Sequence, residues 1–595
     1  MLLYRSFNLN WPRSQSSQTL RDLKEARKEA IAITVFLALI AVLAALVFMN
    51  PPSSRSARIH HPRPTSLHTP LSSVIKKACT KTLYSSLCFT TLSSIPPSNT
   101  TVTFHHVLEF AINQTKEHVL DTQVASVAHF ENQELNAQQQ NALRDCMEML
   151  DQTTYELEQA IDDLHKFPSK RGYIPRSYGY LKILLSAAMT NGYTCIDGLS
   201  DLEELGSDGQ KDLKGHFENL LTPISHMISN CLAMIAEVER EMRKETLNNP
   251  RMLSMKVQED GFLDWMTVAD RKLMETPTEL SPNVIVASDG SGDYTRIGEA
   301  IANAPDFSTK RYVIKINAGI YGENVVIPRE KINLMLTGDG MNSTILIGSK
   351  NFVDGYSTFA SATLTVAGDK FIAQHLSIIN TAGAEKHQAV ALRVTSNAAF
   401  YRCEMISYQD TLYAHSLRQF YRECSIGGTV DFIFGNAAAI FQNCLILPRK
   451  PGPGQRNMIT AQGREDPNQN TGIILQNCTI KAAPDFPFQD RKYFPTFLGR
   501  PWRNFSRTII MKSYLDDLIN PQGWSVWNQY SRLDTIEYIE YMNTGPGSDT
   551  RRRVQWGGYK KNCTEDIERQ FAVGAFLHGA DNWLESTVFP LLSGS

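Results

Sequence analysis

The sequence predicts a parallel β-helix in the second half of the chain, preceded by a helical bundle and one transmembrane helix. Three observations support this prediction: a repeat of about 20 residues, a region with apolar residues at helical spacing, and a long uncharged apolar segment near the amino end. With 595 residues, the chain is long enough for two or three such units.

The repeat is visible in two residue types that recur at the same interval. Asp410 and Asp431 lie 21 residues apart, and Cys403, Cys424 and Cys444 follow one another at nearly the same spacing. Short apolar stretches between them are broken by Gly, Asn, Asp and Ser, which is typical of brief strands joined by turns. Repeats that cannot bury their own apolar face must stack on their neighbours, so a solenoid is expected. A β-sandwich of many short strands is the alternative.

The two aspartates would stack side by side if they occupy the same phase on adjacent coils. Two carboxylates that close cannot both ionise cheaply, so one becomes an acid and the other needs a counter-ion. Arg500 offers a planar fork suited to that role, and Gln388 and Gln409 can place amides toward an oxyanion. Each of these residues also has a purely structural interpretation: the aspartates can form turns, the glutamines can form a stacked amide ladder, and Arg500 can belong to a structural ion pair.

The region from Leu71 to Met234 has apolar residues at helical spacing, which predicts an amphipathic helical bundle. The recurring positions include Leu143, Met147, Leu150, Leu157, Ile161 and Leu164.

Five cysteines accompany this helical region. Cys79 and Cys88 are close enough in sequence to staple a helical hairpin, while Cys146 and Cys195 can tie two helices together. Cys231 is expected to be a small buried apolar residue. No metal site is predicted, because no histidine or second cysteine stands at ligand spacing beside these residues.

The amino end predicts a signal anchor at residues 30–49, after a cytosolic tail at 1–29. The segment is uncharged and long enough to cross a bilayer of about 30 Å. A cleaved signal peptide and a buried core helix are the alternatives.

The remaining chain has the features of a secreted protein without a nucleic-acid partner. Its 59 basic residues nearly balance 61 acidic ones, so no strong field favours nucleic acid. Ten cysteines suit an oxidising compartment. Glycosylation is expected at Asn99, Asn113, Asn342 and Asn504.

Several ordered motifs resemble a known family. The motifs are Gly319-Ile320-Tyr321-Gly322-Glu323, Gln388-Ala389-Val390-Ala391-Leu392-Arg393, the run from Tyr408 to Tyr421, Asp431-Phe432-Ile433-Phe434-Gly435-Asn436 and Leu498-Gly499-Arg500-Pro501-Trp502. With these motifs, residues from Asn283 to about Pro590 resemble plant pectin methylesterase (pectinesterase), and Leu71 to Met234 resembles the plant invertase/pectin methylesterase inhibitor.

The resemblance implies a right-handed β-helix, a four-helix pro domain and hydrolysis of methyl esters in homogalacturonan, without a cofactor. Asp431 then matches the nucleophile, Asp410 the general acid and base, and Arg500 the group that orients and ionises Asp431. Gln388 and Gln409 match the oxyanion site. Substrate contacts are expected from Thr358, Gln388, Arg500, Trp502 and Trp524.

The resemblance also implies a disulfide between Cys424 and Cys444, with Cys403–Cys424 and Cys444–Cys478 as the rival pairing. His387 is expected in an outer shell and His415 in a structural role. Cys563 is an additional thiol.

The family resemblance sets the expected domains: an inhibitor-like bundle at 71–235, a linker at 236–282 and the β-helix at 283–590. Within the linker, Arg271, Lys272, Leu273 and Met274 resemble a site for a subtilisin-like processing protease. The expected route is a Golgi membrane precursor and then the cell wall.

The expected partners are methylesterified homogalacturonan, separate inhibitor proteins and, through the anchor, a membrane; the pro region is expected to restrain the enzyme. The competing function is a non-catalytic pectin-binding or inhibitor protein.

Overall fold

A computed structural model describes residues 71–96, 103–131, 133–166, 174–204, 210–247, 281–561 and 565–577. The chain divides into two compact units, Met1–His68 and Thr69–Ser595, and every described residue belongs to the second. The expected anchor at 30–49, the tail before it and the processing site at 271–274 lie outside the described residues.

The transmembrane part of the predicted fold class is corrected by the structure. Among the described residues, no helix combines the length and the apolar character needed to span a bilayer. The apolar helices that are described instead bury one face in a protein core.

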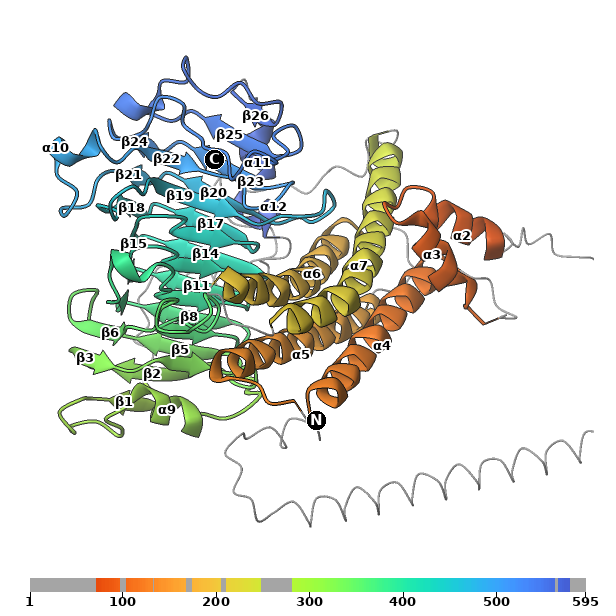
Figure 1. Cartoon of the computed structure of the whole chain (residues 1–595), viewed down its shortest axis with the longest axis horizontal. Helices are drawn as coiled ribbons and strands as arrows, with labels where there is room; N and C mark the ends of the chain where they lie inside the picture. Colours follow the sequence, from red (N-terminus) through yellow and green to blue (C-terminus); the bar gives the residue numbers. More distant parts are fainter. Residues whose placement is uncertain are drawn as a thin grey trace, which may run out of the picture. The chain divides into compact units, whose positions relative to one another are not determined.

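The helical region is built from four long helices and a short amino-terminal hairpin (Figure 1). The helices are α2 (Leu71–Cys79), α3 (Ser85–Ser93), α4 (Phe104–Phe130), α5 (Ala137–Lys166), α6 (Ile174–Glu204) and α7 (Gln210–Leu247). The predicted residues Leu150, Leu157 and Leu164 of α5 are buried, which confirms the helical periodicity. α7 continues to Leu247, beyond the predicted end of the bundle at 235.

Two disulfides tie this helical region together. Cys79 is bonded to Cys88 across the α2–α3 hairpin, and Cys146 of α5 is bonded to Cys195 of α6. Both pairings were predicted from the sequence and are confirmed. Cys231 is a buried free thiol, also as predicted.

The second half of the chain winds into three parallel sheets, so the β-helix is confirmed and the β-sandwich is excluded (Figure 1). Sheet 1 contains β1 (Val284–Val286), β2 (Tyr312–Ile316), β5 (Leu334–Thr337), β8 (Phe371–Gln374), β11 (Ala398–Tyr401), β14 (Arg418–Arg422), β17 (Ala438–Gln442), β20 (Gly472–Gln476), β23 (Arg507–Met511), β25 (Glu537–Tyr541) and β26 (Tyr559–Lys560).

Sheet 2 and sheet 3 complete each coil. Sheet 2 contains β4 (Val325–Ile327), β7 (Leu364–Val366), β10 (Leu392–Val394), β13 (Leu412–Ala414), β16 (Ile433–Gly435), β19 (Asn457–Gln462) and β22 (Thr496–Gly499). Sheet 3 contains β3 (Gly319–Gly322), β6 (Thr344–Gly348), β9 (Ser377–Asn380), β12 (Glu404–Ile406), β15 (Ser425–Gly428), β18 (Leu445–Pro448), β21 (Thr479–Ile480) and β24 (Tyr514–Leu515).

Short helices lie outside the sheets: α9 (Ile297–Asn303), α10 (Phe488–Arg491), α11 (Asp566–Gln570), α12 (Val573–Phe576), η3 (Ala384–Lys386) and η4 (Pro546–Ser548). α9 packs against β1, β2 and β4, and buries Ile297 and Ile301 in the core at the start of the β-helix. This helix therefore covers apolar residues that the first coil would otherwise expose.

Identical positions on successive coils stack inside the β-helix. Leu392 pairs with Leu412, and Leu412 pairs with Ile433, all fully buried. The fully buried rings of Phe400, Tyr421 and Phe441 also stack, with centroids 5.0 and 4.5 Å apart. This ladder fixes the register, because a slip by one residue would turn the buried side chains outward.

Candidate active site

Asp410 and Asp431 stand at the same phase of neighbouring coils, as the sequence spacing predicts. Each lies two residues before a pair of register partners, Leu412 of β13 and Ile433 of β16. The Asp410 amide donates a hydrogen bond of 3.0 Å to the carbonyl of Val430, the residue before Asp431. Neighbouring strands are spaced about 4.8 Å apart. Both carboxyl groups are therefore brought to one edge of sheet 2.

Both aspartates have a backbone conformation that residues other than glycine seldom adopt. Asp410 has a φ of 63° and Asp431 a φ of 50°. Such left-handed residues persist where surrounding structure holds them, and they cluster at functional sites. Both side chains are nearly buried, with exposed fractions of 7% and 4%.

Arg500 holds Asp431 through two parallel hydrogen bonds. Its Nε donates to Oδ1 at 2.8 Å and its Nη2 to Oδ2 at 2.6 Å. Arg500 directly follows β22, where its amide donates to the carbonyl of Thr460. The Trp527 ring lies 4.2 Å from the guanidinium carbon. A two-point contact of this kind fixes the carboxylate plane as well as its charge.

The charges of this cluster shift one another's protonation. Burial raises the pKa of Asp431 by more than the guanidinium of Arg500 lowers it. Burial lowers the pKa of Arg500, but the carboxylates of Asp431 and Asp410 raise it by more. The two-point geometry is that of an ionised carboxylate, so Asp431 is a charged group whose pKa lies above its ordinary value.

Gln388 and Gln409 are neighbours on adjacent coils. They form a parallel β-bridge, and the amide of Ala389 donates to the carbonyl of Gln409 at 3.2 Å. Both side chains are partly exposed, and Gln409 directly precedes Asp410. The two glutamines therefore belong to the same edge as the aspartates.

An aromatic surface extends along sheet 2 beside the aspartates, and the sequence prediction included only Trp502 from it. The Tyr413 and Phe434 rings stack at 4.2 Å, and Trp502 lies 6.0 Å from Phe434 and 6.4 Å from Trp527. Tyr413 and Phe434 occupy the middle positions of β13 and β16, between residues that point into the core. This alternation, read along each short strand, was the signal that would have found them.

The prediction for Trp524 is wrong. Trp524 is 1% exposed, and its indole N–H donates to the buried carboxylate of Glu540 at 3.2 Å. Gly499 forms a β-bridge with Trp524, which places the residue in the solenoid wall. A sugar ring cannot reach it, whereas Trp527, three residues later, lies beside Arg500.

His415 is fully buried on the same sheet. Its Nε2 lies 2.8 Å from the Thr194 hydroxyl of α6, and its Nδ1 lies 2.9 Å from the Ser416 hydroxyl. Burial, together with the charge of Arg393, lowers its pKa to about 3. His415 is therefore neutral, and no carboxylate orients it as a catalytic base would require. His387 is exposed, with a φ of 57°.

The predicted disulfide between Cys424 and Cys444 is absent, and so are the rival pairings. Cys403, Cys424, Cys444 and Cys478 are all buried free thiols. Cys424 and Cys444 lie within 3.5 Å of the carbonyl oxygens of Phe400 and Tyr421 on the preceding coils. The thiols therefore have backbone acceptors in place of a covalent partner.

The remaining site predictions stay untested. Asn113 lies on α4, Asn342 is exposed in a turn, and Asn504 donates to Glu465 at 3.3 Å. Asn99 and Cys563 lie outside the described residues. Thr358 is partly exposed and follows Ser357, which contacts the helical region.

Helix α6 contacts the aromatic surface of sheet 2. The Asn436 amide donates to the Thr190 hydroxyl at 2.8 Å, Thr194 reaches His415, and Asp197 forms an ion pair with Arg503. Tyr413 and Phe434 share an apolar cluster with residues of α5 and α6. The helical region thus covers part of the surface that the aspartates adjoin.

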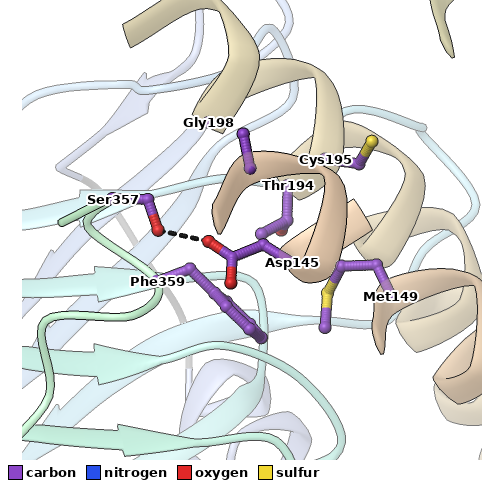
Figure 2. Close-up of a pocket in the computed structure, with 8 residues that line it drawn as sticks. Asp145, Met149, Thr194, Cys195, Gly198, Ser357 and Phe359 are labelled. Atoms are coloured by element: carbon purple, nitrogen blue, oxygen red, sulfur yellow. Dashed lines mark hydrogen bonds between the residues drawn. The ribbon is translucent and has the colours of Figure 1, made fainter. Parts of the chain in front are cut away.

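Helix α5 contacts the same surface through Asp145. The Ser357 hydroxyl donates to Asp145 at 2.5 Å above the ring of Phe359, and Figure 2 shows the two polar side chains facing one another. The cavity around them is also lined by Met149, Thr194, Cys195 and Gly198. Much of the Asp145 surface is covered, and its carboxyl group lies within the contact. Water therefore solvates the charged carboxylate poorly, which disfavours its ionisation.

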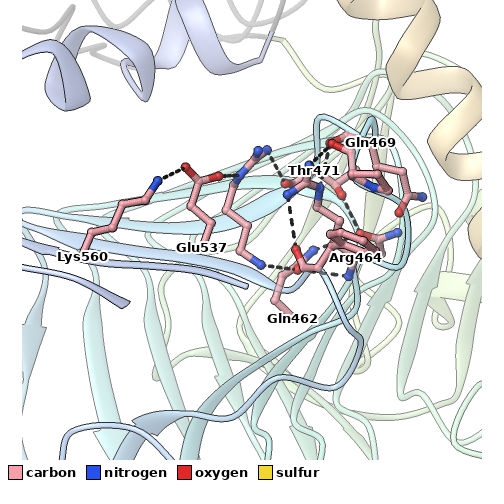
Figure 3. Close-up of polar contacts among 10 residues, drawn as sticks. Gln462, Arg464, Gln469, Thr471, Glu537 and Lys560 are labelled. Carbon is pink, nitrogen blue, oxygen red and sulfur yellow. Dashed lines mark hydrogen bonds and ion pairs between the residues drawn. The ribbon is translucent and has the colours of Figure 1, made fainter. Parts of the chain in front are cut away.

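A polar network supports the loop between β19 and β20, which also contacts the bundle. Gln462 accepts from the amides of Arg464 and Arg507, and Arg464 donates to the carbonyl of Gln469 at 2.8 Å (Figure 3). Gln469 donates to the carbonyl of Ser186 at 3.3 Å. The loop that contacts α6 is therefore held in place by hydrogen bonds within the β-helix.

The sequence of this chain matches two family models. Residues 283–580 match the family described as Pectinesterase, and residues 73–234 match Plant invertase/pectin methylesterase inhibitor. The chain belongs to the pectinesterase family. The predicted enzyme class is confirmed, as is the presence of an inhibitor-like region.

Two plant relatives align with most of this chain, and one solved structure aligns with about half of it. Pectinesterase/pectinesterase inhibitor U1 of Solanum lycopersicum is 42% identical over 97% of this chain and 98% of its own length. Pectinesterase 2 of Arabidopsis thaliana is 43% identical over 88% of this chain and 90% of its own. The solved structure "Pectin methylesterase from Carrot" is 52% identical, with a TM-score of 0.53, and covers 54% of this chain and all of the carrot chain. The carrot structure is therefore that of a chain about half as long as this one.

We expect the contact between bundle and β-helix to weaken as pH rises from about 4 to about 6. Burial raises the pKa of Asp145 from 3.8 to about 6, with the nearby Glu148 also raising it and Ser357, Arg393 and Arg144 lowering it. Below pH 4 the carboxyl is protonated whether or not the bundle is bound. Between pH 4 and pH 6, the Asp145 carboxyl is ionised in the released bundle but still protonated in the bound one, so rising pH favours release. Above about pH 6 the bound carboxyl is ionised as well, and the effect levels off.

The measurement is retention of the bundle by the β-helix after the linker is cut, followed by size-exclusion chromatography across this pH range. Asp145→Asn removes the titration and should flatten the profile between pH 4 and 6. A profile that is equally steep in Asp145→Asn would assign the effect to another group.

Proposed function

We propose that this chain hydrolyses the methyl esters of homogalacturonan through a covalent acyl-enzyme on Asp431. The observation that carries the proposal is the buried carboxylate of Asp431. Arg500 holds it at two points, and Asp410 lies at the same phase one coil away from Asp431. An ionised carboxylate with a fixed plane is a prepared nucleophile. A second carboxyl group at the same edge supplies the acid.

The first half of the reaction releases methanol. An oxygen of Asp431 attacks the ester carbonyl carbon and forms a tetrahedral oxyanion, toward which the amides of Gln388 and Gln409 donate. As the intermediate collapses, the bond to the methoxy oxygen breaks and Asp410 transfers its proton to that oxygen. Methanol leaves, and the galacturonyl group remains joined to Asp431 as an anhydride.

The second half of the reaction restores the enzyme. Asp410, now a carboxylate, takes a proton from water while the water oxygen attacks the anhydride carbonyl. The bond to Asp431 breaks, so Asp431 regains its charge beside Arg500 and Asp410 regains its proton. One ester and one water become one galacturonate carboxylic acid and one methanol.

The aromatic surface of Tyr413, Phe434 and Trp502 supports the proposed substrate class. Sugar rings present apolar C–H faces that pack on aromatic rings, and a row of rings along sheet 2 suits a chain of sugars. Thr358 lies at the Arg393 end of this row, next to Phe359. We assign Trp502 as the main stacking residue.

The bundle restrains this activity in the proposed scheme. Thr190, Thr194 and Asp197 of α6 contact residues beside the aromatic row, so a polysaccharide cannot occupy the same surface while the bundle remains. A subtilisin-like protease acting at Arg271–Met274 would separate the two parts, and separate inhibitor proteins would fit the vacated surface. The working location in this scheme is the plant cell wall.

Asp431→Asn should abolish methanol release from methylesterified pectin by the processed enzyme, lowering turnover by about a thousandfold or more because no nucleophile remains. Asp517→Asn is the matched control, since Asp517 is an exposed carboxylate paired with Arg491. Residual turnover in Asp431→Asn close to that of the control would exclude Asp431 as the nucleophile.

Arg500→Gln should move the acid limb of the kcat/KM profile to higher pH. Asp431 must be ionised to attack, so activity is lost as pH falls through its pKa. Arg500 lowers that pKa against the effect of burial, and removing the guanidinium raises it further. Arg491→Gln, which breaks the surface pair with Asp517, is expected to leave the limb in place. A limb that stays put in Arg500→Gln would contradict the assigned role.

The intact chain should release methanol much more slowly than the same chain cut between bundle and β-helix. The reason is steric, because the bundle covers the aromatic row. The comparison is initial rate at equal concentration before and after cleavage at an engineered site within 271–274. Equal rates with the bundle still attached would reject the restraint.

A further inference from the structure

Arg393 presents a feature that the proposed reaction does not use. The residue lies in β10 and is 4% exposed, yet its Nε and Nη1 atoms have no hydrogen-bond partner among the described residues. Only Nη2 donates, to Glu148 of the bundle at 3.4 Å, and the ring of Phe359 lies 3.2 Å from the guanidinium carbon. A buried guanidinium with two unsatisfied donor groups is costly, and such a group needs an explanation.

Among the described residues, Arg393 is one of three β-helix arginines that meet carboxylates of the bundle. Arg329 forms an ion pair of 2.8 Å with Asp151, and Arg503 forms one with Asp197. On α5 the residues Asp145, Glu148 and Asp151 follow one another at intervals of three. Each interval advances about 4.5 Å along a helix, so the three carboxylates form a row.

The three arginines belong to strands of sheet 2 or to the turns that follow them. Val326, which is in register with Arg393, lies three residues before Arg329. Gly499, which is in register with Leu392, lies four residues before Arg503. Arg329 follows β4, Arg393 is in β10 and Arg503 follows β22, and these strands belong to sheet 2 in the order β4, β7, β10, β13, β16, β19, β22. At a strand spacing of about 4.8 Å, the distance from β4 to β22 across the sheet is roughly 29 Å. The aspartates precede β13 and β16, so cationic groups flank the proposed reaction centre on both sides.

We propose that Arg329, Arg393 and Arg503 form a track that binds de-esterified, anionic galacturonate units, and that the carboxylates of the bundle occupy this track as mimics of them. The inference deepens the proposed function and rests on it. It assigns the arginines a ligand that the reaction itself produces, since each turnover converts a neutral ester into a carboxylate. A guanidinium fork matches a carboxylate at two points.

The unsatisfied donors of Arg393 separate this assignment from an ordinary structural ion pair. Glu148 reaches a single nitrogen at a long distance, so the bundle satisfies the guanidinium only in part. A galacturonate carboxylate that lies in the plane of the fork can accept from both free groups. Ser357, which donates to Asp145 in this structure, offers a further donor beside Arg393.

The first arm of the test is competition with the bundle. The full chain carrying Asp431→Asn, to prevent turnover, is cut at an engineered site in 271–274 and titrated with galacturonate oligomers of one length. One oligomer is fully de-esterified and the other fully methylesterified. The de-esterified oligomer should release the bundle at about tenfold lower concentration, and added salt should reduce the difference. Equal release by both oligomers would overturn the proposal.

The second arm tests the arginines in the β-helix part recovered from the cut chain. Arg329→Gln and Arg393→Gln should each weaken binding of the de-esterified oligomer by about tenfold, and binding of the methylesterified oligomer by much less. Arg402→Gln is the matched control, because Arg402 is an exposed arginine between sheets 1 and 3, paired with Glu423. Equal losses for both oligomers, or no loss in either variant, would overturn the track.

The outcome is distinguishable from failure of the proposed function. Methanol release by the cut wild-type chain tests the esterase independently of these binding measurements. Release without any dependence of oligomer binding on the arginines rejects the track alone. Absence of release rejects the esterase, and with it the origin of the anionic ligand.

Discussion

The in-register stacking of parallel coils is the constraint on which the site depends. Leu392, Leu412 and Ile433 pair through sheet 2 as buried neighbours, so every residue at a given phase is fixed beside its counterpart one coil away. The register of this ladder brings Asp410 and Asp431 to the same phase of adjacent coils. A shift of one residue in either strand would turn core residues outward, which makes the carboxylate pairing as secure as the core itself.

Burial then gives these carboxylates their chemical character. Asp431 is removed from water, which opposes its charge, and Arg500 restores that charge through two donors in one plane. Removing one partner of such a buried pair typically costs about 3–5 kcal/mol, so the pair couples stability to function. The unfavourable backbone conformation of both aspartates belongs to the same arrangement, because the surrounding ladder holds residues that would relax elsewhere.

The bundle meets the β-helix through an apolar cluster and through polar contacts around it. Carboxylates of α5 and α6 face arginines, hydroxyls of α6 face His415 and Asn436, and backbone carbonyls of α6 accept from the loop after β19. The surface that carries these arginines is therefore covered by carboxylates of the bundle.

The sequence alone determined the coil period, the phase of the two aspartates, the helical region with its two disulfides, and the family, because each of these is carried by local spacing or by linear motifs. Tertiary structure decided that Trp524 is buried while Trp527 adjoins Arg500, that Cys424 and Cys444 remain thiols, and that Arg393 lies beneath the bundle. Periodicity fixes which coil a residue belongs to. The direction of a side chain between strands, and the partner it meets from another domain, depend on packing between segments far apart in the sequence.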